Sequence, residues 1–431
     1  MKRREFMKAA GVSTVGVSLA GCGAAGDANC PDTSVTTAPV PDRQRFNYVG
    51  PDADVQSGYF KFMAEPATTI DFGLSPADEE RAAELHRTLH IFDSEPEVGY
   101  HPNLIDNLLA SGAGGVAGSF TMDALPHDLI NGVSGADVRI RPADWWARAT
   151  LESNLAFMDK LVAHKGDQVQ ICTSHSDVLA AQAAGKVGMM LDCQNTMFIR
   201  NDLEQLEYFY EKGVRRVQLS YNQQMQAASG CMEPRDGGVT MWGARVIGKL
   251  NELNILVDTG HCSSMTLSDA IDISERPIAC SHAGMRSIAP DNPRTHTDEG
   301  LKKLADNGGV FGVVGVPGTL IPGSDTASVA DFVEAIDRAV NVMGIEHVGF
   351  ALDQIQGPSP DEFFTSPDWP PEAAASVSVT DWPWSDTFRG MENQSGYMNL
   401  TRGLVAKGYS DENIRKVMGE NHLRLIKDVI G

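Results

Sequence analysis

Two histidines each end a short apolar run of the kind that forms a buried strand. The first run, residues 255–259, leads through a glycine to His261, and the second, residues 277–281, leads directly to His282. In a parallel α/β fold the carboxyl ends of the strands surround the reactive mouth, so the two imidazoles are predicted to lie close together. One such histidine is more often a structural residue. Two at neighbouring strand ends favour a metal ion such as zinc, which neutral imidazole binds well.

Other polar side chains follow the remaining apolar runs. They are carboxylates, amides and a phenol, and they belong to Asp93, Glu95, Glu97, Asp192, Gln194, Tyr221, Asn222 and Asp353. Imidazoles and carboxylates on one rim could hold an ion that lowers the pKa of a bound water toward ~7, and a free carboxylate could then accept the proton. Any one of these groups alone could simply cap a loop. Their convergence predicts a hydrolytic metal centre.

The elements that would position these groups alternate between strand and helix. Eight short apolar runs are predicted as strands: 89–93, 114–120, 187–193, 216–220, 255–259, 278–281, 309–314 and 347–352. Amphipathic segments such as 202–212, 242–253 and 330–343 are predicted as helices between them. This alternation predicts an α/β protein with one TIM (β/α)8 barrel over residues 58–431. Residues 169–173 are predicted as an accessory ninth strand.

The composition suits a large α/β core and an acidic surface. The 431 residues are 42% hydrophobic and carry a formal net charge of −22, which argues against a nucleic-acid partner. The seven cysteines show neither a CxxC metal motif nor the spacing of a disulfide framework. Cys172, Cys193 and Cys280 lie in strand-like runs and are predicted to be buried thiols.

The amino-terminal segment is predicted to be a targeting sequence. A basic head with Arg3 and Arg4 precedes an apolar stretch, residues 9–20, that is too short to span a bilayer. The twin arginines resemble a bacterial twin-arginine signal, and residues 19–22 resemble a lipobox ending at Cys22. The resemblance implies a signal peptide over 1–21, lipidation of Cys22, a flexible tether over 22–57 and a lipid-anchored location on the periplasmic face of a bacterial membrane. The alternative is a retained amino-terminal helix.

Several motifs between about Leu85 and Leu425 resemble one known family. They are Val217 to Asn222, Leu256 to His261, Pro277 to His282, Pro293-Arg294 with Thr297-Asp298-Glu299, Gly349 to Asp353, and the closing stretch Asn399 to Asn421. With these motifs the chain resembles the membrane (renal-type) dipeptidases, peptidase family M19. The resemblance implies a zinc-dependent α/β barrel that hydrolyses dipeptides.

The resemblance also implies roles for single residues. His261 and His282 match the two histidines of one metal, and Asp353 matches the aspartate tied to the other metal and to proton transfer. Arg294 matches the arginine that binds the substrate carboxylate, a task suited to a bidentate guanidinium.

Four residues at three places depart from the family pattern. Glu95 and Glu97 stand where the family usually has His-x-Asp, Gln194 stands at the bridging glutamate, and Tyr221 replaces a histidine. A neutral Gln194 lacks the charge that offsets the repulsion between two cations, and glutamate ligands would favour Zn²⁺ less strongly over Mg²⁺ or Mn²⁺. The expected ligand set is therefore either the full one, with one or two ions, or a reduced single-metal site. The full set comprises His261, His282, Glu95, Glu97, Gln194 and Asp353.

The expected function is hydrolysis of a small amide, with a dipeptide as the first candidate substrate. Asp353 would act as the base, and Arg294, Tyr221 and Asn222 would contact the substrate. The alternatives are a single-metal hydrolase of a non-peptide amide or lactone, and a non-catalytic relative that binds a ligand. A long Pro- and Trp-rich loop, residues 357–387, is predicted to lie over the mouth. The alternatives are a solvent-exposed excursion or a subunit contact in a homodimer.

Overall fold

The computed structural model describes residues 66–98, 104–122, 129–130, 133–134, 148–324, 327–355 and 388–431. The predicted signal peptide and tether lie outside the described residues, and so does the Pro- and Trp-rich loop at 357–387. Among the described helices, none combines the length and the apolar character needed to cross a bilayer.

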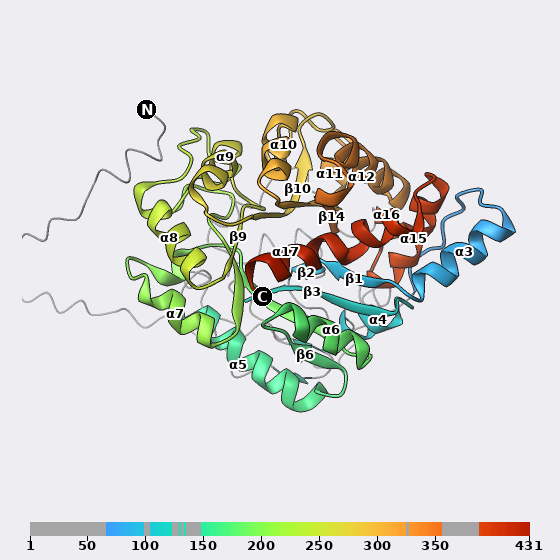
Figure 1. Ribbon diagram of the computed structural model, residues 1–431, viewed down its shortest axis with the longest axis horizontal. Coiled ribbons are helices and arrows are strands. Elements are labelled where there is room, and N and C mark those ends of the chain that lie inside the picture. The colour runs from blue at the N-terminus through green and yellow to red at the C-terminus, as the bar shows by residue number, and fades with distance from the viewer. Residues whose placement is uncertain are drawn as a thin grey trace, which may run out of the picture. The chain divides into compact units, whose positions relative to one another are not determined.

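Eight parallel strands form the central sheet in chain order, each paired with the next (Figure 1). They are β1 (His90–Asp93), β3 (Gly115–Thr121), β7 (Val187–Cys193), β8 (Val214–Gln218), β9 (Leu256–Asp258), β10 (Ala279–Met285), β12 (Val310–Val314) and β14 (Val348–Ala351). Chain-order parallel pairing with helical crossovers is the topology of a TIM barrel, which confirms the predicted fold class. The predicted accessory strand is β6 (Val169–Ile171), which pairs with β7.

Helices connect the strands and surround the sheet, and the last of them, α17, runs across one end of the barrel (Figure 1). They are α3 (Pro76–His86), α4 (Leu104–Ala110), α5 (Arg148–Lys165), α6 (His175–Ala183), α7 (Glu204–Glu211), α8 (Met241–Glu252), α9 (Ser264–Ile273), α10 (Asp298–Asp306), α11 (Pro317–Leu320), α12 (Val329–Met343), α15 (Tyr397–Ala406), α16 (Asp411–Arg415) and α17 (Asn421–Val429). Serine or threonine side chains cap several of them: Thr240 at α8, Ser263 at α9 and Thr297 at α10 each accept a hydrogen bond from a backbone N–H of the first turn.

The seam between β14 and β1 closes the barrel. Ser94 N donates to Phe350 O at 3.3 Å, and the short strands β2 (Glu97–Val98) and β15 (Gln354–Ile355) continue the parallel pairing beyond it. The buried Asp93 carboxylate accepts from Leu352 N at 3.1 Å and from the Tyr397 hydroxyl at 2.6 Å. Asp93 therefore ties the first strand, the last strand and α15 together.

Two predicted strand boundaries were wrong in a way that matters for the site. The fourth strand ends at Gln218 rather than residue 220, so Tyr221 and Asn222 belong to the loop that follows it. The sixth strand runs from Ala279 to Met285, so His282 lies inside β10 rather than after it. The local pattern hid this continuation because Ser281 and His282 interrupt the apolar run, although every residue of β10 is buried.

The interior of the barrel is unusually polar. Branched apolar layers normally fill a TIM barrel, but here buried polar side chains project from the strands. They include Thr121, Asp192, Arg216, Gln218, Asp258, Ser281 and His282. A buried polar group is tolerated only when its hydrogen bonds are satisfied, so the partners of these groups define the chemistry of the interior.

Candidate functional site

His261 and His282 lie side by side, as predicted from their strand positions. Their ring centroids are 4.7 Å apart with a 72° angle between the planes, and both side chains are buried. Burial and the neighbouring Arg294 hold the pKa of both imidazoles well below the usual value, so both are neutral. Neutral imidazole is the form that binds a metal.

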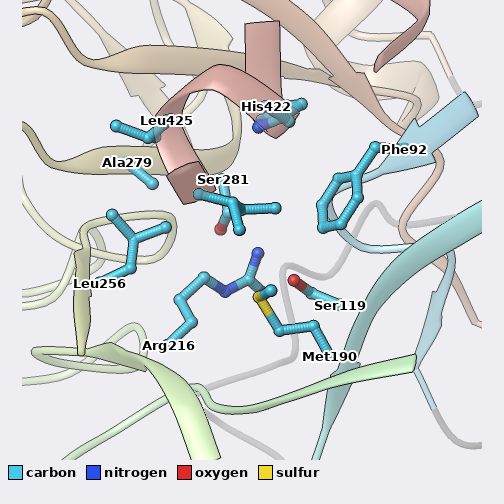
Figure 2. Close-up of a pocket in the computed structure, with 10 residues that line it drawn as sticks. Phe92, Ser119, Met190, Arg216, Leu256, Ala279, Ser281, His422 and Leu425 are labelled. Carbon is cyan, nitrogen blue, oxygen red and sulfur yellow. The ribbon is translucent and has the colours of Figure 1, made fainter. Parts of the chain in front are cut away.

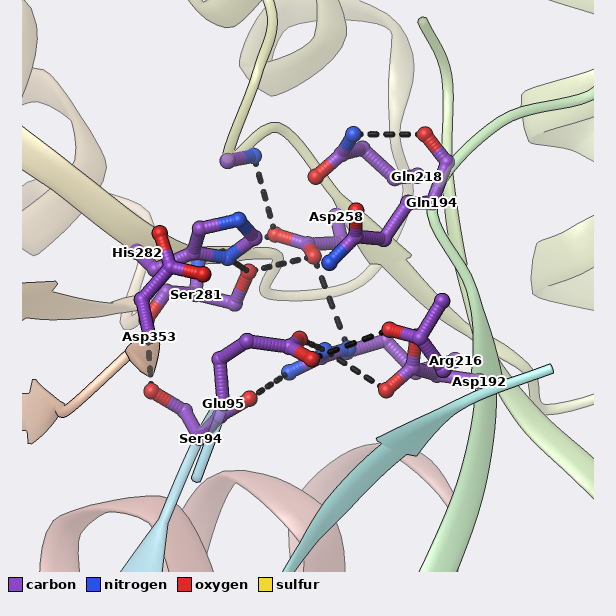
Figure 3. Close-up of polar contacts among 12 residues, drawn as sticks. Ser94, Glu95, Asp192, Gln194, Arg216, Gln218, Asp258, Ser281, His282 and Asp353 are labelled. Atoms are coloured by element: carbon purple, nitrogen blue, oxygen red, sulfur yellow. Dashed lines mark hydrogen bonds and ion pairs between the residues drawn. The ribbon is translucent and has the colours of Figure 1, made fainter. Parts of the chain in front are cut away.

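The hydrogen bonds of His282 define its tautomer. Ser281 Oγ donates to Asp258 Oδ2 at 2.6 Å and lies 2.7 Å from His282 Nδ1 (Figure 3). Since the serine hydroxyl has one proton and gives it to the carboxylate, it must accept the proton of Nδ1. His282 Nε2 is then an acceptor, and it is buried with no hydrogen-bond partner among the described residues. A buried lone pair of this kind is what a metal ligand presents.

The second ring is oriented by the loop after β8. His261 Nδ1 lies 2.8 Å from Asn222 Oδ1, an acceptor, so Nδ1 carries the proton and Nε2 carries the lone pair. Tyr221 stacks on the same ring at 3.9 Å between centroids. Asn222 has a positive φ of 56°, a conformation that asparagine adopts more readily than most residues. The structure thus places Tyr221 and Asn222 against His261.

Arg294 provides the positive charge beside His261 and His282. Its Nη1 donates to Gly260 O, and its Nη2 lies 3.2 Å from His282 O and 3.4 Å from His261 Nε2. The same nitrogen is 3.8 Å from Asp353 Oδ2, in a buried ion pair. Arg294 therefore links the imidazole pair to the carboxylate predicted as the base.

Asp353 stands just after β14 in a strained backbone conformation. Its φ is 47°, and its N–H donates to Glu95 O at 2.6 Å. Burial raises the pKa of its carboxyl to about 7, against the lowering effect of Arg294. Strained residues persist where the surroundings fix them, and they are often found at functional sites.

A second cluster surrounds the guanidinium of Arg216, which is 2% exposed. Its Nη2 lies 2.8 Å from Glu95 Oε2 and 2.7 Å from Asp192 Oδ2, and its Nη1 donates to Ser94 O at 2.6 Å (Figure 3). Its Nε is 3.5 Å from Asp258 Oδ2. Burial raises the pKa of Asp192 to about 6, and burial together with Asp192 raises that of Glu95 well above its ordinary value. Three carboxyl groups thus share one fixed positive charge.

The structure describes the other predicted ligands, Gln194 and Glu97, to different extents. Gln194 is buried, and its backbone carbonyl accepts from Gln218 Nε2 at 2.6 Å. The Glu97 backbone belongs to β2, while its side chain lies outside the described residues. Among the described residues, no three His, Cys, Asp or Glu side chains come together in a group that could hold a metal ion. The metal roles of these positions stay predictions.

The histidine pair and the Arg216 cluster therefore differ in how well they could bind a metal ion. His282, with its orphaned buried Nε2, fits a ligand of one divalent ion, and the neutral His261 ring beside it can join only if its Nε2 gives up the 3.4 Å contact with Arg294 Nη2. The Glu95 carboxylate does not fit in the same way, because its oxygens already contact Arg216 and the Thr121 hydroxyl.

Sequence reasoning missed Arg216, Asp258 and Ser281 as members of the site. The available signal was the segment Val214–Gln218, in which two adjacent arginines interrupt a central barrel strand. Because side chains alternate along a strand, one of the two must point into the barrel. Ser281 and Asp258 gave a weaker signal, since each directly precedes or lies near a predicted histidine.

Comparisons with known proteins agree with the fold. The family model for membrane dipeptidases (peptidase family M19) matches residues 128–362, which is more than half of the chain. An uncharacterized dipeptidase of Schizosaccharomyces pombe is 27% identical over 287 residues, covering 65% of this chain and 62% of the relative. The dipeptidase tcpJ of Claviceps purpurea is 23% identical over 274 residues, covering 63% and 58%. The chain thus spans less than two thirds of the length of these relatives.

A solved structure extends the likeness to most of the described barrel. An amidohydrolase from Pseudomonas aeruginosa superposes with a TM-score of 0.67 at 26% identity, covering 81% of this chain and 99% of the other. The family match spans β7 to β14 and so includes both histidines and Asp353. On this evidence the chain belongs to the membrane dipeptidase family, peptidase family M19.

Proposed function

We propose that the protein is a metal-dependent hydrolase of small amides, with dipeptides as its substrate class. The observation that carries the proposal is the buried Nε2 of His282, which lacks a partner among the described residues and lies on an imidazole oriented by Ser281 and Asp258. Such a carboxylate-backed imidazole beside a second neutral imidazole suits a zinc ion. A bound divalent ion would supply a Lewis acid that activates water and polarises the amide carbonyl.

The protein's own groups would perform the remaining tasks. Asp353 would accept the proton of the attacking water and pass it to the leaving amine, because its carboxyl is held at the mouth by the strained backbone after β14. Arg294 would attract the substrate carboxylate, since its buried positive charge lies between His261 and Asp353. Tyr221 and Asn222 would keep the His261 ring fixed during the reaction.

One observation favours a second candidate, a single-metal hydrolase of a non-peptide amide or lactone. The Glu95 carboxylate, which was expected to be a ligand, is bound to Arg216. A site with one ion instead of two provides less positive charge to bind and polarise a zwitterionic dipeptide. The two candidates therefore differ in substrate class and not in the residues that act.

A substrate panel tests the proposal. Metal-loaded protein is assayed on dipeptides, N-acyl amino acids and simple lactones, beside Asp353→Asn. The variant should keep its metal but lose roughly 10²-fold or more in turnover, because an amide cannot accept a proton. Hydrolysis of lactones but not dipeptides would favour the second candidate. Absence of turnover on the whole panel would overturn both in favour of a ligand-binding relative.

We further propose that the protein is an exported lipoprotein anchored through Cys22. The support is the order of basic head, short apolar core and lipobox-like residues in the sequence. Replacing Cys22 with alanine should move the protein from the membrane fraction to the soluble fraction of cells. An unchanged distribution of the variant would contradict the anchor.

A further inference from the structure

The Arg216 guanidinium lies between the carboxylates of Glu95 and Asp192. Its Nη2 lies 2.8 Å from Glu95 Oε2 and 2.7 Å from Asp192 Oδ2, so one nitrogen bridges both acids. On the other side of these acids, Thr121 Oγ1 lies 2.9 Å from Glu95 Oε1 and 3.1 Å from Asp192 Oδ1. The two carboxylates are thus held together from both ends.

The third acid of the cluster is also saturated. Asp258 Oδ1 accepts from the backbone N–H groups of Thr259, Gly260 and Ser281 at 2.7, 3.2 and 2.9 Å. Its Oδ2 accepts from Ser281 Oγ and faces Arg216 Nε at 3.5 Å. Asp258 therefore has no oxygen left for an ion without losing contacts that orient the His282 ring.

A fixed cation among these acids opposes the binding of a second cation. The guanidinium is effectively always protonated, and in a buried site its repulsion of a nearby divalent ion is weakly screened. Arg216 is also anchored by the backbone carbonyl of Ser94, which holds it in the barrel interior. In contrast, the described groups around His282 Nε2 leave that lone pair without a partner.

We propose that Arg216 is a built-in cation that neutralises Glu95 and Asp192 and keeps a second metal out, so that the protein binds one exchangeable ion at His261 and His282. This inference rests on the proposed function for the identity of the histidine site. In this proposal Glu95 is the ion-pair partner of Arg216 and not a metal ligand. Arg216 is a positioning residue, which acts through the carboxylates that it holds.

A small cavity makes the substitution of Arg216 testable. It lies against the guanidinium and is lined in part by Ser119, Met190 and His422 (Figure 2). Lysine and methionine are no larger than arginine, so neither substitution at position 216 overpacks the interior. Arg215 provides a matched control, since it precedes Arg216 in β8 and its guanidinium bonds instead to Thr173 O at 2.9 Å and Tyr210 O at 2.7 Å.

The experiment is the metal content of full-length protein equilibrated with zinc and measured by elemental analysis, with circular dichroism to confirm folding. Wild type, Arg216→Lys and Arg215→Met should each bind one zinc per chain. Arg216→Met should bind two, because the uncompensated carboxylates then form a second site. Two zinc ions per wild-type chain, or an unchanged single ion in folded Arg216→Met, would overturn the proposal.

Glu95→Gln keeps the proposal testable if Arg216→Met does not fold. Because Glu95 is assigned to Arg216, the variant should still bind one zinc, and loss of that zinc would overturn the assignment. Failure of the proposed function can be told apart from failure of the role of Arg216, since metal content is measured without turnover. One ion with no hydrolysis contradicts only the proposed function, two ions with hydrolysis contradict only the role of Arg216, and absence of zinc binding contradicts both.

Discussion

The imidazole pair and the Arg216 cluster are neighbouring buried regions that share one residue, Asp258. In the Arg216 cluster, both carboxylate oxygens of Glu95, Asp192 and Asp258 contact a donor group. The positive charge of the cluster belongs to the chain itself. In the imidazole pair, both Nδ1 atoms are satisfied while His282 Nε2 is buried without a partner among the described residues. An unsatisfied buried polar atom costs about 1–3 kcal/mol. The difference indicates that the acids of the first region are satisfied as folded, whereas the second region presents a free lone pair to a ligand.

Removing one imidazole should have the largest effect on this contrast. His282→Ala should lose most of the bound metal and at least ~10³-fold in turnover, since metal activation supplies several kcal/mol of barrier lowering. The measurement is zinc content together with the rate on the best substrate. His86→Ala is the control, because both ring nitrogens of the buried His86 are bonded, to Thr401 Oγ1 and Ser111 O. Equal metal loss in both variants would point to general destabilisation.

Breaking the link between the two regions should have an intermediate effect. Ser281→Ala removes the hydroxyl that joins Asp258 to His282 Nδ1, so the ring loses its fixed tautomer. Loss of such a supporting contact typically weakens metal binding 10–100-fold, and zinc titration calorimetry would measure the change. Thr259→Val is a suitable control, since that hydroxyl donates to Ala279 O at 2.9 Å and the substitution should leave zinc affinity unchanged. Unaltered affinity in Ser281→Ala would remove the hydroxyl from the metal site.

The smallest effect should appear on the far side of Arg216, at His422. Burial, Arg216 and Arg424 lower the pKa of this imidazole to about 3. Between that value and the ordinary pKa near 6.5, the unfolded chain binds a proton that the folded chain does not, so stability falls as the pH falls. One pH unit below 6.5, the contribution lost is about 1 kcal/mol.

Urea unfolding of the metal-free protein at pH 7.5 and 5.5 measures this contribution. His422→Asn should lose less stability between the two pH values than wild type, because it has no imidazole to titrate. The variant removes only the His422 contribution, so other titrating groups cancel in the comparison. Identical losses for the two proteins would show that His422 is protonated in the folded state.

The sequence predicted the imidazole pair because histidines that follow short apolar runs are a local feature. The runs before His261 and His282 define two neighbouring strands, and the topology of a parallel barrel brings their ends together. The eight barrel strands were predictable for the same reason, since each is a short buried run that ends near a polar residue.

The Arg216 cluster could not be predicted in the same way. Glu95, Asp192 and Arg216 come from β1, β7 and β8 or the turns that follow them, and nothing in the separate segments shows which acid meets the arginine. The family pattern placed Glu95 with a metal, whereas the folded chain places it with a guanidinium. Ion pairing of this kind depends on three-dimensional proximity and on the absence of a better partner, neither of which is a property of the local sequence.

The Asp93–Tyr397 contact has a consequence for synthesis of the chain. These residues are 304 positions apart, and Arg402 of α15 likewise bonds to Glu79 of α3 at 2.7 Å, which sets the two helices side by side (Figure 1). At ~5–20 residues per second, the first strand leaves the ribosome roughly 15–60 s before Tyr397, the partner of Asp93, is synthesised. The strands that meet at the seam, β1 and β14, are both made before Tyr397, so the contact between them can form first. A nascent chain that ends before Tyr397 therefore lacks only the hydrogen bonds that tie α15 to β1 and α3, and these are added when the final helices are made.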